Sequence, residues 1–413
     1  MKLKKVLALV LIVALLAAVG VALVACDPED EFKVGFIFLH DESSTYDKNF
    51  IDAAREATAA LGLSDSQVLF RTNVPESEEC YNAARDLVDE GCDIIFADSF
   101  GHEQYMLQAA REFPDVQFCH ATGTRAHTEG VANYHNAFAS IYEGRYLAGI
   151  AAGMKLVDMY GDENDALTDE EAKIGYVGAY TYAEVISGYT SFYLGVKSIV
   201  PNVTMEVTFT GSWYDETAER EGASLLISRG AKLISQHADS MGAPSACEQQ
   251  NIPNVSYNGS TEASCPNTFI VSSRINWVPY FNYMITQVQN GEAIAADWTG
   301  TLENGAVVLT DVGAAAAAGT QDAINAARAQ LIAGTLEVFN TANFTVTKTD
   351  TLNVNATVDN GVLTAYMADV NYDEAFAADT QVVANGVFEE SAYRSAPYFD
   401  VRIDGITLLN QKF

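Results

Sequence analysis

The feature that most constrains the fold of this chain is a regular alternation of strand and helix patterns that begins at Lys33. Short runs of β-branched and aromatic residues alternate with longer stretches whose apolar residues recur at helical spacing, such as Ile51, Ala54 and Ala57. Alternation of this kind is typical of parallel sheets that carry helices on both faces. The series occurs twice along the chain, which predicts two Rossmann-like lobes of the α/β class.

The expected elements follow one another in a simple order. In the first half, strands are predicted at 33–39, 67–74, 93–98 and 116–121, and helices at 49–61, 76–90, 102–112 and 140–157. In the second half, strands are predicted at 173–177, 204–210, 232–236, 254–257 and 268–275, and helices at 184–200 and 216–229. A helix at 279–289 is expected to cross back to the first lobe. A strand at 306–310 and a helix at 321–333 then complete the body.

These patterns divide the chain into two lobes and an extension, because one hydrophobic core rarely serves so many residues. The expected bounds are 32–157 with a returning segment near 279–295 for the first lobe, 170–278 with 296–335 for the second, and 336–413 for the extension. The acidic stretch 161–171 is interpreted as the loop before the second lobe. The extension is rich in Thr, Val and Asn and contains the turn signals Asp359-Asn360-Gly361 and Asn385-Gly386, so it is expected to be a small β-rich unit.

The N-terminal segment 1–26 has the pattern of a secretory signal. A short basic segment precedes the uncharged run 6–25, whose end is crowded with small residues. The run is long enough to span a bilayer, so a retained transmembrane helix is the alternative. However, Leu23-Val24-Ala25-Cys26 resembles the bacterial lipobox, and the acidic stretch 27–31 follows it. We therefore expect lipidation at Cys26 and a lipid-anchored protein on the extracytoplasmic face of the cell membrane.

The strongly negative charge of the chain excludes some classes of partner. The formal net charge is -32, and such a surface repels phosphate backbones and anionic lipid headgroups. We therefore expect no binding to nucleic acid.

The five cysteines outside the lipobox match no metal signature, and no CxxC motif occurs. Cys247 and Cys265 flank a loop that a disulfide could close, whereas Cys119 lies in an apolar strand pattern and is expected in the core.

Sequence motifs of enzymes are absent. No Gly-x-Ser-x-Gly, Walker loop, GxGxxG or HExxH sequence occurs, and the six histidines include no pair at metal-ligand spacing on one helix face. Ser, His and Asp residues are present, but nothing in their spacing joins them into a triad. We therefore expect no enzymatic activity, no cofactor and no metal.

Polar and aromatic residues gather where the predicted strands end. Ligands of open parallel sheets bind beyond the carboxyl ends of the strands, so these positions are the candidate site. The candidates for ligand binding are Asp41, Ser44, Tyr46, Asp47, Asn49, Phe100, Gly101, Trp213, Asp239, Asn258 and Asn276. Aromatic rings and hydrogen-bonding groups at one cleft favour a flat, partly apolar ligand.

Several of these residues have a purely structural alternative. Asp41, Ser44 and Asp47 could cap the first helix, and Asp215 could cap the helix at 216–229. Phe100 could be a core residue. His237, which also follows a predicted strand, is interpreted as a structural histidine rather than a ligand contact. Trp213 is the most informative candidate, because a Gly-Ser-Trp sequence at a strand end places a large ring where core packing does not require one.

The combination of several stretches resembles one protein family. The matching stretches are Val34–Phe38, Ser44-Thr45-Tyr46-Asp47, Phe96–Gly101, Glu112–Val116, Tyr142–Gly149, Gly211–Asp215 and Gln236–Asp239. Together they resemble the basic membrane protein family of lipoproteins, which are substrate-binding proteins of ABC importers with purine nucleoside receptors as the best-known type. The resemblance implies the type I periplasmic-binding-protein fold, in which two lobes close on a hinge. It covers 33–310 and leaves out the segment from Leu336.

The resemblance also implies roles for particular residues. Two aromatic rings sandwich the base in this family, and those positions fall on Tyr46 and Trp213. Asp47 matches the polar residue beside the first ring, and Phe100 matches a pocket position after the third strand. The chain departs from the pattern at two places. Asn258 aligns with an aspartate that reads the base in this family, and Asn276 stands where a lysine holds the ribose.

The function implied by the resemblance is capture of a purine nucleoside or purine base by stacking between two closing lobes. The partners would be the permease and ATPase subunits of an ABC importer, and the protein is expected to act as a monomer. One alternative is a receptor for a sugar or a signalling furanose on the same scaffold. Another is the ligand-sensing subunit of a membrane signalling system, which would need a partner because the chain contains no kinase or transferase motif.

Overall fold

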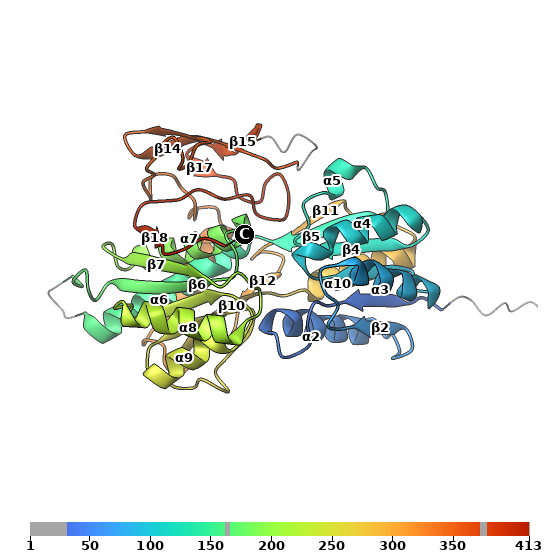
Figure 1. Cartoon of the computed structure of the whole chain (residues 1–413), viewed down its shortest axis with the longest axis horizontal. Helices are drawn as coiled ribbons and strands as arrows, with labels where there is room; N and C mark the ends of the chain where they lie inside the picture. The colour runs from blue at the N-terminus through green and yellow to red at the C-terminus, as the bar shows by residue number, and fades with distance from the viewer. Residues whose placement is uncertain (1–30, 162–165, 372–377, 413) are drawn as a thin grey trace, which may run out of the picture.

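The computed structural model describes residues 31–161, 166–371 and 378–412 of the 413-residue chain. The expected signal segment and Cys26 lie outside the described residues. Within these ranges, no helix is long and apolar enough to cross a membrane. The described chain forms two α/β lobes side by side, with a smaller β-rich extension above the second lobe (Figure 1). The predicted fold, two lobes with parallel sheets and a β-rich extension, is confirmed.

The first lobe contains a six-stranded sheet in which all neighbouring strands pair in parallel. In spatial order its strands are β11 (Asp297–Gly300), β5 (Tyr134–Ala139), β4 (Gln117–Ala121), β3 (Ile94–Ala97), β1 (Val34–Ile37) and β2 (Val68–Arg71). Strands β1 and β3 are buried along their whole length, as parallel strands are when helices cover both faces. The apolar runs that predicted these strands reflect this double burial.

Helices cover both faces of the first sheet. Helices α2 (Thr45–Ala60) and α10 (Val278–Asn290) lie on one face, and α3 (Glu78–Asp89) and α4 (Glu103–Glu112) lie on the other (Figure 1). Successive side chains of β1 point to opposite faces, so Phe36 packs against Phe281 of α10 while Ile37 packs in a cluster with Leu87 and Leu107. The turn η1 (Phe100–His102) and the short helix α5 (Ala126–Glu129) complete the lobe.

The second lobe contains a seven-stranded sheet. In spatial order its strands are β12 (Val307–Leu309), β10 (Phe269–Ile275), β9 (Asn254–Tyr257), β8 (Ile234–His237), β6 (Lys173–Gly178), β7 (Thr204–Phe209) and β18 (Ile406–Leu408). Only the edge pair of β12 with β10 is antiparallel in this sheet as described. The helices are α6 (Ile141–Tyr160), α7 (Ala183–Lys197), α8 (Glu216–Ser228), α9 (Gly242–Gln250) and α11 (Thr320–Ile332).

The structure differs from the sequence prediction at the crossings between the lobes. The helix expected at 140–157 in the first lobe is α6, which packs against α7 and β10 of the second. Residues 297–300, expected in the second lobe, form β11 at the edge of the first sheet. Strand β5 was not predicted, because His135 and Asn136 interrupt its apolar pattern. The imidazole of His135 is hydrogen-bonded to the side chain of Gln117, and the amide oxygen of Asn136 accepts from the backbone nitrogen of Arg125. These hydrogen bonds allow both polar side chains to be buried.

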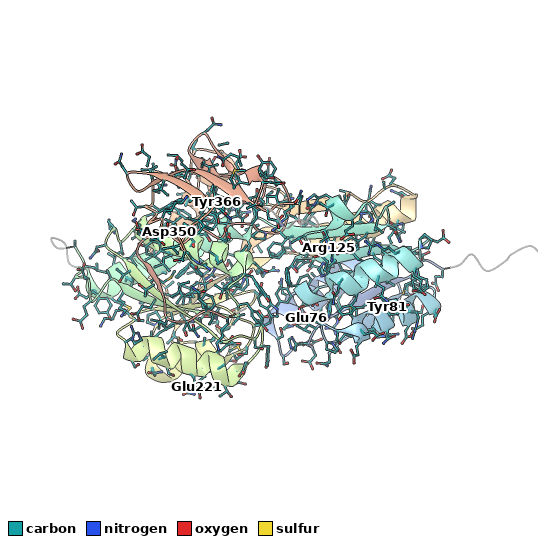
Figure 2. All side chains as sticks on the ribbon, turned by 45° about the horizontal axis from the view of Figure 1, so that its top comes forward. Glu76, Tyr81, Arg125, Glu221, Asp350 and Tyr366 are labelled. Atoms are coloured by element: carbon teal, nitrogen blue, oxygen red, sulfur yellow. The ribbon has the colours of Figure 1, made fainter. Side chains whose placement is uncertain are left out.

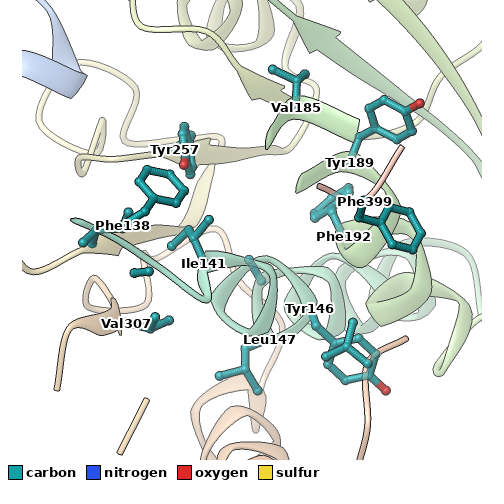
Figure 3. Close-up of a cluster of buried hydrophobic side chains, with 14 of the residues drawn as sticks. Phe138, Ile141, Tyr146, Leu147, Val185, Tyr189, Phe192, Tyr257, Val307 and Phe399 are labelled. Carbon is teal, nitrogen blue, oxygen red and sulfur yellow. The ribbon is translucent and has the colours of Figure 1, made fainter. Parts of the chain in front are cut away.

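The extension consists of short strands around two tight turns. Its strands are β13 (Ala356–Asp359), β14 (Val362–Ala368), β15 (Thr380–Gln381), β16 (Val383–Ala384), β17 (Val387–Phe388) and β18. Asn360-Gly361 and Asn385-Gly386 adopt left-handed conformations between paired strands, as their sequences predicted. Phe399 of the extension belongs to the same buried cluster as Tyr189 and Phe192 of α7 (Figure 3). The extension therefore shares its core with the second lobe.

All five cysteines of the described chain are free and buried. The disulfide considered for Cys247 and Cys265 is therefore not formed in this structure. Cys119 lies on β4 with no exposed surface, which confirms its predicted place in the core.

Two glycines allow α6 and α7 to pack at very short range. A Cβ atom added at Gly149 would lie 2.2 Å from the carbonyl oxygen of Phe192 and 2.9 Å from the Cα of Gly195. Backbone atoms of α7 cannot move aside as a side chain could. Figure 3 shows the buried side chains of α6 and α7 next to this contact.

We therefore expect Gly149→Ala to lower the free energy of unfolding by about 1–3 kcal/mol, because overpacking a close helix contact forces the backbone apart. The measurement is urea denaturation followed by circular dichroism. Gly259→Ala is the matched control, since its added Cβ would have no heavy atom closer than 3.8 Å. Equal stability of the two variants would contradict this account of the packing.

Candidate functional site

A narrow cavity of about 20 Å³ lies between the two lobes. Its walls come from both lobes, at the carboxyl ends of their strands, where open parallel sheets bind ligands. The lining residues are Leu39, Tyr46, Ser99, Phe100 and Thr122 of the first lobe and Glu184, Trp213, His237, Asp239 and Tyr257 of the second. Four predicted site residues, Tyr46, Phe100, Trp213 and Asp239, are therefore brought together here.

Tyr46 stands on the first turn of α2, directly after the helix cap. Ser44 is that cap, and its hydroxyl accepts a hydrogen bond from the backbone of Asp47 at 3.2 Å. The phenol of Tyr46 donates to the carbonyl oxygen of Asp98 at 2.7 Å, and its ring centroid lies 4.8 Å from that of Phe50. The ring is thus fixed at both ends while it still lines the cavity.

Trp213 lines the cavity from the second lobe and packs against two rings that do not line it, Tyr180 and Tyr182; we call these three rings the aromatic wall. The centroid of Trp213 lies 5.1 Å from that of Tyr180 and 6.1 Å from that of Tyr182. Phe100 of the first lobe meets this wall, with its centroid 5.3 Å from that of Tyr182. The aromatic wall follows β6 and β7, so its rings are carried by two adjacent strand ends.

Two carboxyl groups of the second lobe line the cavity. No described residue donates a hydrogen bond to the carboxylate of Asp239, which is buried. Burial, together with the nearby Asp47, Glu219 and Glu184, raises the pKa of Asp239 well above its usual value. Glu184 at the start of α7 lies 3.3 Å from Nε2 of His237.

His237 lines the cavity and contacts Glu184, whereas the sequence interpretation made it structural. Burial lowers the pKa of His237, although the hydrogen bond to Glu184 acts in the opposite direction. Its Nδ1 finds no hydrogen-bond partner among the described residues. The imidazole ring lies 4.1 Å from the ring of Tyr257 between centroids.

The lobes touch each other beside the cavity. The backbone nitrogen of Thr45 donates to the carbonyl oxygen of Asp239 at 2.9 Å, and the hydroxyl of Thr45 lies 3.1 Å from the same oxygen. The rings of His40 and Tyr214 also meet across the cleft, at 5.4 Å between centroids. These contacts hold the two halves of the site together.

A second, more open cavity of about 360 Å³ is lined by three other predicted residues, Asn49, Asn258 and Asn276. Asn49 joins the lobes, because its amide donates to the carbonyl of Ile275 at 2.7 Å and accepts from Arg274 at 3.2 Å. Asn258 is 2 % exposed, has a left-handed backbone with φ 63°, and its Nδ2 lacks a partner within the described chain. A strained residue with an unpaired amide is typical of a functional position.

The remaining predicted residues support the loops instead of lining either cavity. Asp41 is an exposed loop residue that accepts hydrogen bonds from Ser43. Asp47 is fully buried and accepts from the backbone of His40 at 2.7 Å and from Ser44 at 2.6 Å. Burial opposes the ionisation of Asp47, but these hydrogen bonds outweigh it and hold its pKa below the usual value.

Gly101 helps to position Phe100. Its backbone nitrogen donates to Glu76 at 2.7 Å, and the hydroxyl of Ser99 donates to the same oxygen at 2.7 Å. Figure 2 shows Glu76 on the side of the first lobe that faces the second. The Phe100 ring is therefore held at the cleft, 37 % exposed, rather than in the core.

Six lining residues are not among the predicted ones: Leu39, Ser99, Thr122, Glu184, His237 and Tyr257. Glu184 belongs to the first turn of α7, and Tyr257 is the last residue of β9. Thr122 follows β4 with φ 65°, and the same strand-end rule would have found it. Asp215, by contrast, caps α8 as its alternative reading predicted, since it accepts from the backbone of Ala218 at 2.9 Å.

The arrangement suits a flat ring between two aromatic surfaces. Tyr46 and Trp213 come from different lobes and line the same narrow space. The oxygens of Asp239 and Glu184 can accept hydrogen bonds at the edge of such a ring. No cluster of three or more metal-ligating side chains occurs among the residues that the structure describes.

Residues 36–341 match the sequence model of a family described as PnrA-like ABC transporter substrate-binding proteins. The chain is 30% identical over 260 residues to a purine-binding protein of Brucella abortus, across 62% of this chain and 69% of that protein. It is 28% identical over 307 residues to a Haloferax volcanii protein provisionally named as an ABC transporter glucose-binding protein, across 74% of this chain and 71% of that one.

A solved structure extends the likeness to the fold. The ABC transporter solute-binding protein of Conexibacter woesei superposes with a TM-score of 0.59 at 22% identity, across 74% of this chain and 98% of that chain. The family match ends at residue 341, so it covers the two lobes and leaves out nearly all of the extension.

Asp239→Asn should stabilise the ligand-free protein at neutral pH by about 0.5–2 kcal/mol, as removal of a strained functional group commonly does. The raised pKa means that ionised Asp239 is less stable in the folded chain than in the unfolded one. This cost appears as the pH rises above the ordinary Asp value, so the gain should vanish below about pH 4. The measurement is Tm against pH.

Asp52→Asn is the control, because Asp52 is an exposed carboxylate whose contact is the surface ion pair with Lys48. Its Tm should match the unmodified protein at every pH. A neutral-pH Tm of Asp239→Asn at or below the unmodified value would contradict the electrostatic account.

Proposed function

The chain belongs to the family of PnrA-like ABC transporter substrate-binding proteins, and on that premise we propose that its ligand is a purine nucleoside or purine base. Substrate-binding proteins of ABC importers act outside the cytoplasm, bind small molecules without chemical change, and deliver them to a permease and its ATPase. The proposal concerns which small molecule this chain binds and which residues hold it.

The observation that carries the proposal is that Tyr46 of the first lobe and Trp213 of the second line the same cavity. Each ring is fixed by contacts of its own lobe, so the distance between them is set by closure of the lobes. A planar purine between two such rings would bury both of its faces. In this structure the cavity is only about 20 Å³, so the two lobes must part before a ring can lie between Tyr46 and Trp213.

The carboxyl groups give the ring an orientation. Asp239 and Glu184 face the cavity, and their oxygens would accept hydrogen bonds from ring or exocyclic N–H groups of a purine. The neighbouring cavity at Asn258 would take the sugar of a nucleoside, because the unpaired amide nitrogen of Asn258 could donate to a hydroxyl group. Phe100 would cover the ligand on the side of the first lobe, and Gly101 would position the Phe100 ring.

A sugar is the second candidate ligand. The pair of carboxyl groups beside a tryptophan also suits a hydroxylated ring, and one relative is named for glucose binding. A sugar would use the hydrogen bonds of Asp239 and Glu184 fully but would need only one aromatic surface. Stacking on both faces thus separates the two candidates.

Trp213→Ala should weaken binding of a purine by about thirtyfold or more, because truncation of a well-packed aromatic anchor commonly costs about 2 kcal/mol. Trp213→Phe should recover part of the affinity, since it restores a stacking surface. The measurement is isothermal titration with adenosine, guanosine, inosine, hypoxanthine and glucose. Trp298→Phe is the control, because Trp298 lies on β11 outside both cavities.

Unchanged affinity of folded Trp213→Ala for a purine that binds the unmodified protein would contradict the stacking proposal. Binding of glucose alone in the panel would replace the purine proposal by the sugar candidate.

We also propose a lipid anchor at Cys26, which lies outside the described residues. The support is the lipobox-like Leu23-Val24-Ala25-Cys26 after an apolar run, and an anchor of several acyl chains would hold the protein stably at the membrane.

Cys26→Ser should abolish incorporation of labelled palmitate and remove the mature protein from the membrane fraction, because serine offers no thiol for the lipid. Metabolic labelling and fractionation of cells measure both effects. Cys80→Ser is the control, because Cys80 is a buried core thiol that should leave the label unchanged. Lipid labelling of Cys26→Ser at the unmodified level would defeat the anchor proposal.

A further inference from the structure

The final residues of the sequence lie beside the strands that carry the aromatic wall. Strand β18 pairs in parallel with β7, so that Ile406 is opposite Met205 and Leu408 opposite Val207. The pairing continues past β18, because the backbone nitrogen of Leu409 donates to the carbonyl of Val207 at 2.8 Å. This path leads residues 409–412 along β7 toward the loop of Trp213.

Asn410 binds the last residue of β7 with its side chain. Its Oδ1 accepts a hydrogen bond from the backbone nitrogen of Phe209 at 2.7 Å, and its Nδ2 donates to the carbonyl oxygen of Phe209 at 2.8 Å. The amide group thus satisfies both backbone groups of one residue, as a neighbouring strand would. Phe209 directly precedes the turn 210–212 that ends at Trp213.

Lys412 holds the second loop of the wall through its backbone. Its carbonyl oxygen accepts from the backbone nitrogen of Thr181 at 2.7 Å, and its nitrogen donates to the hydroxyl of Thr181 at 2.9 Å. Thr181 stands between Tyr180 and Tyr182, and it is 4 % exposed. The carbon chain of Lys412 also lies over Gly211, 3.5 Å from where a Cβ atom would be.

Asn410 and Lys412 therefore each bind one of the two segments that carry the three rings of the aromatic wall. We propose that the tail segment 406–412 is part of the ligand site of this chain, with Asn410 and Thr181 as positioning residues for Tyr180, Tyr182 and Trp213. This inference rests on the proposed function only in taking the aromatic wall as a ligand surface. The tail lies outside the family match at 36–341, so the attachment is not a part of that shared pattern.

The physical reason is preorganisation. Loops that end parallel strands have few partners of their own, and rings on a mobile loop must be ordered when the ligand binds. Here Gly211 adopts φ 82°, a left-handed conformation that glycine reaches without steric cost. Because glycine has no Cβ atom, its own side chain does not restrain the turn. Hydrogen bonds from the tail supply the restraint before the ligand arrives. Loss of these bonds should loosen the wall without unfolding the lobe.

The test compares hydrogen–deuterium exchange of the full-length, ligand-free protein with Asn410→Ala. We expect exchange in segments 179–182 and 209–214 to become at least tenfold faster, with no change in β1, β3 or β9. Asn343→Ala is the matched control, because Asn343 is an exposed asparagine of the same extension. Unchanged exchange in both segments of folded Asn410→Ala would overturn the proposal, as would a uniform increase over the whole second lobe.

A second variant protects the test against misfolding of the first. Thr181→Val keeps the shape of the side chain but removes the hydroxyl that bridges both backbone groups of Lys412. It should accelerate exchange at 180–182 and leave β18 protected. Exchange at the unmodified rate there would count against the proposal.

Titration with inosine and guanosine separates this inference from the proposed function. If either nucleoside binds the unmodified protein, Asn410→Ala should weaken that binding about tenfold, mainly through faster dissociation, and equal affinity would overturn the inference alone. If neither binds, the purine proposal fails, and the exchange data still decide whether the tail restrains the wall.

Discussion

The second lobe depends on a guanidinium group buried at its centre. Arg145 of α6 is 0% exposed, and no carboxylate among the described residues forms an ion pair with it. Its partners are the hydroxyls of Tyr176, Ser235 and Ser273, the carbonyl of Ser256, and the ring faces of Tyr176, Phe192 and Tyr257. Burial of an unpaired cation is costly, so these hydrogen bonds and aromatic faces must all stay in place to offset it. Because they come from β6, β8, β9, β10 and α7, one side chain fixes the helix that enters the lobe against four strands of its sheet.

This anchoring reaches the ligand cavity through a short chain of contacts. Tyr257 has its ring 5.4 Å from the Arg145 guanidinium and also lines the cavity. His237 stacks near Tyr257 and in turn meets Glu184, the acidic group of the first turn of α7. Glu184 and His237 are therefore attached to the core of the second lobe, whereas Asp239 and Trp213 stand on segments that follow strand ends.

The sequence predicted the features that depend on the hydrophobic periodicity of strands and helices. It missed those that depend on hydrogen-bond partners far away in the sequence. The strand and helix periods predicted two parallel-sheet lobes, and the strand-end rule selected Tyr46, Phe100, Trp213 and Asp239, which the structure brings to one cavity. Strand β5 escaped because buried polar side chains there are satisfied by hydrogen bonds that no local pattern reveals. Glu184 escaped for a related reason, since an acid in a first helical turn is usually explained by the helix dipole. Its role in the cavity follows only from the position of His237, which lies far away in the sequence.

The extension lies almost wholly outside the family match, yet its last residues bond to the end of β7 and to Thr181. Short strands and hairpins of this size are not expected to be stable alone, and here they share a core with α6 and α7 through Phe339 and Phe399. In return, β18 covers the edge of β7, which would otherwise present unpaired backbone groups to solvent. The extension also contacts the first lobe, because the backbone of Ser395 donates to Asp297 at 3.1 Å. The extension thus packs through a core shared with α6 and α7, while separate hydrogen bonds of Asn410 and Lys412 reach Phe209 and Thr181.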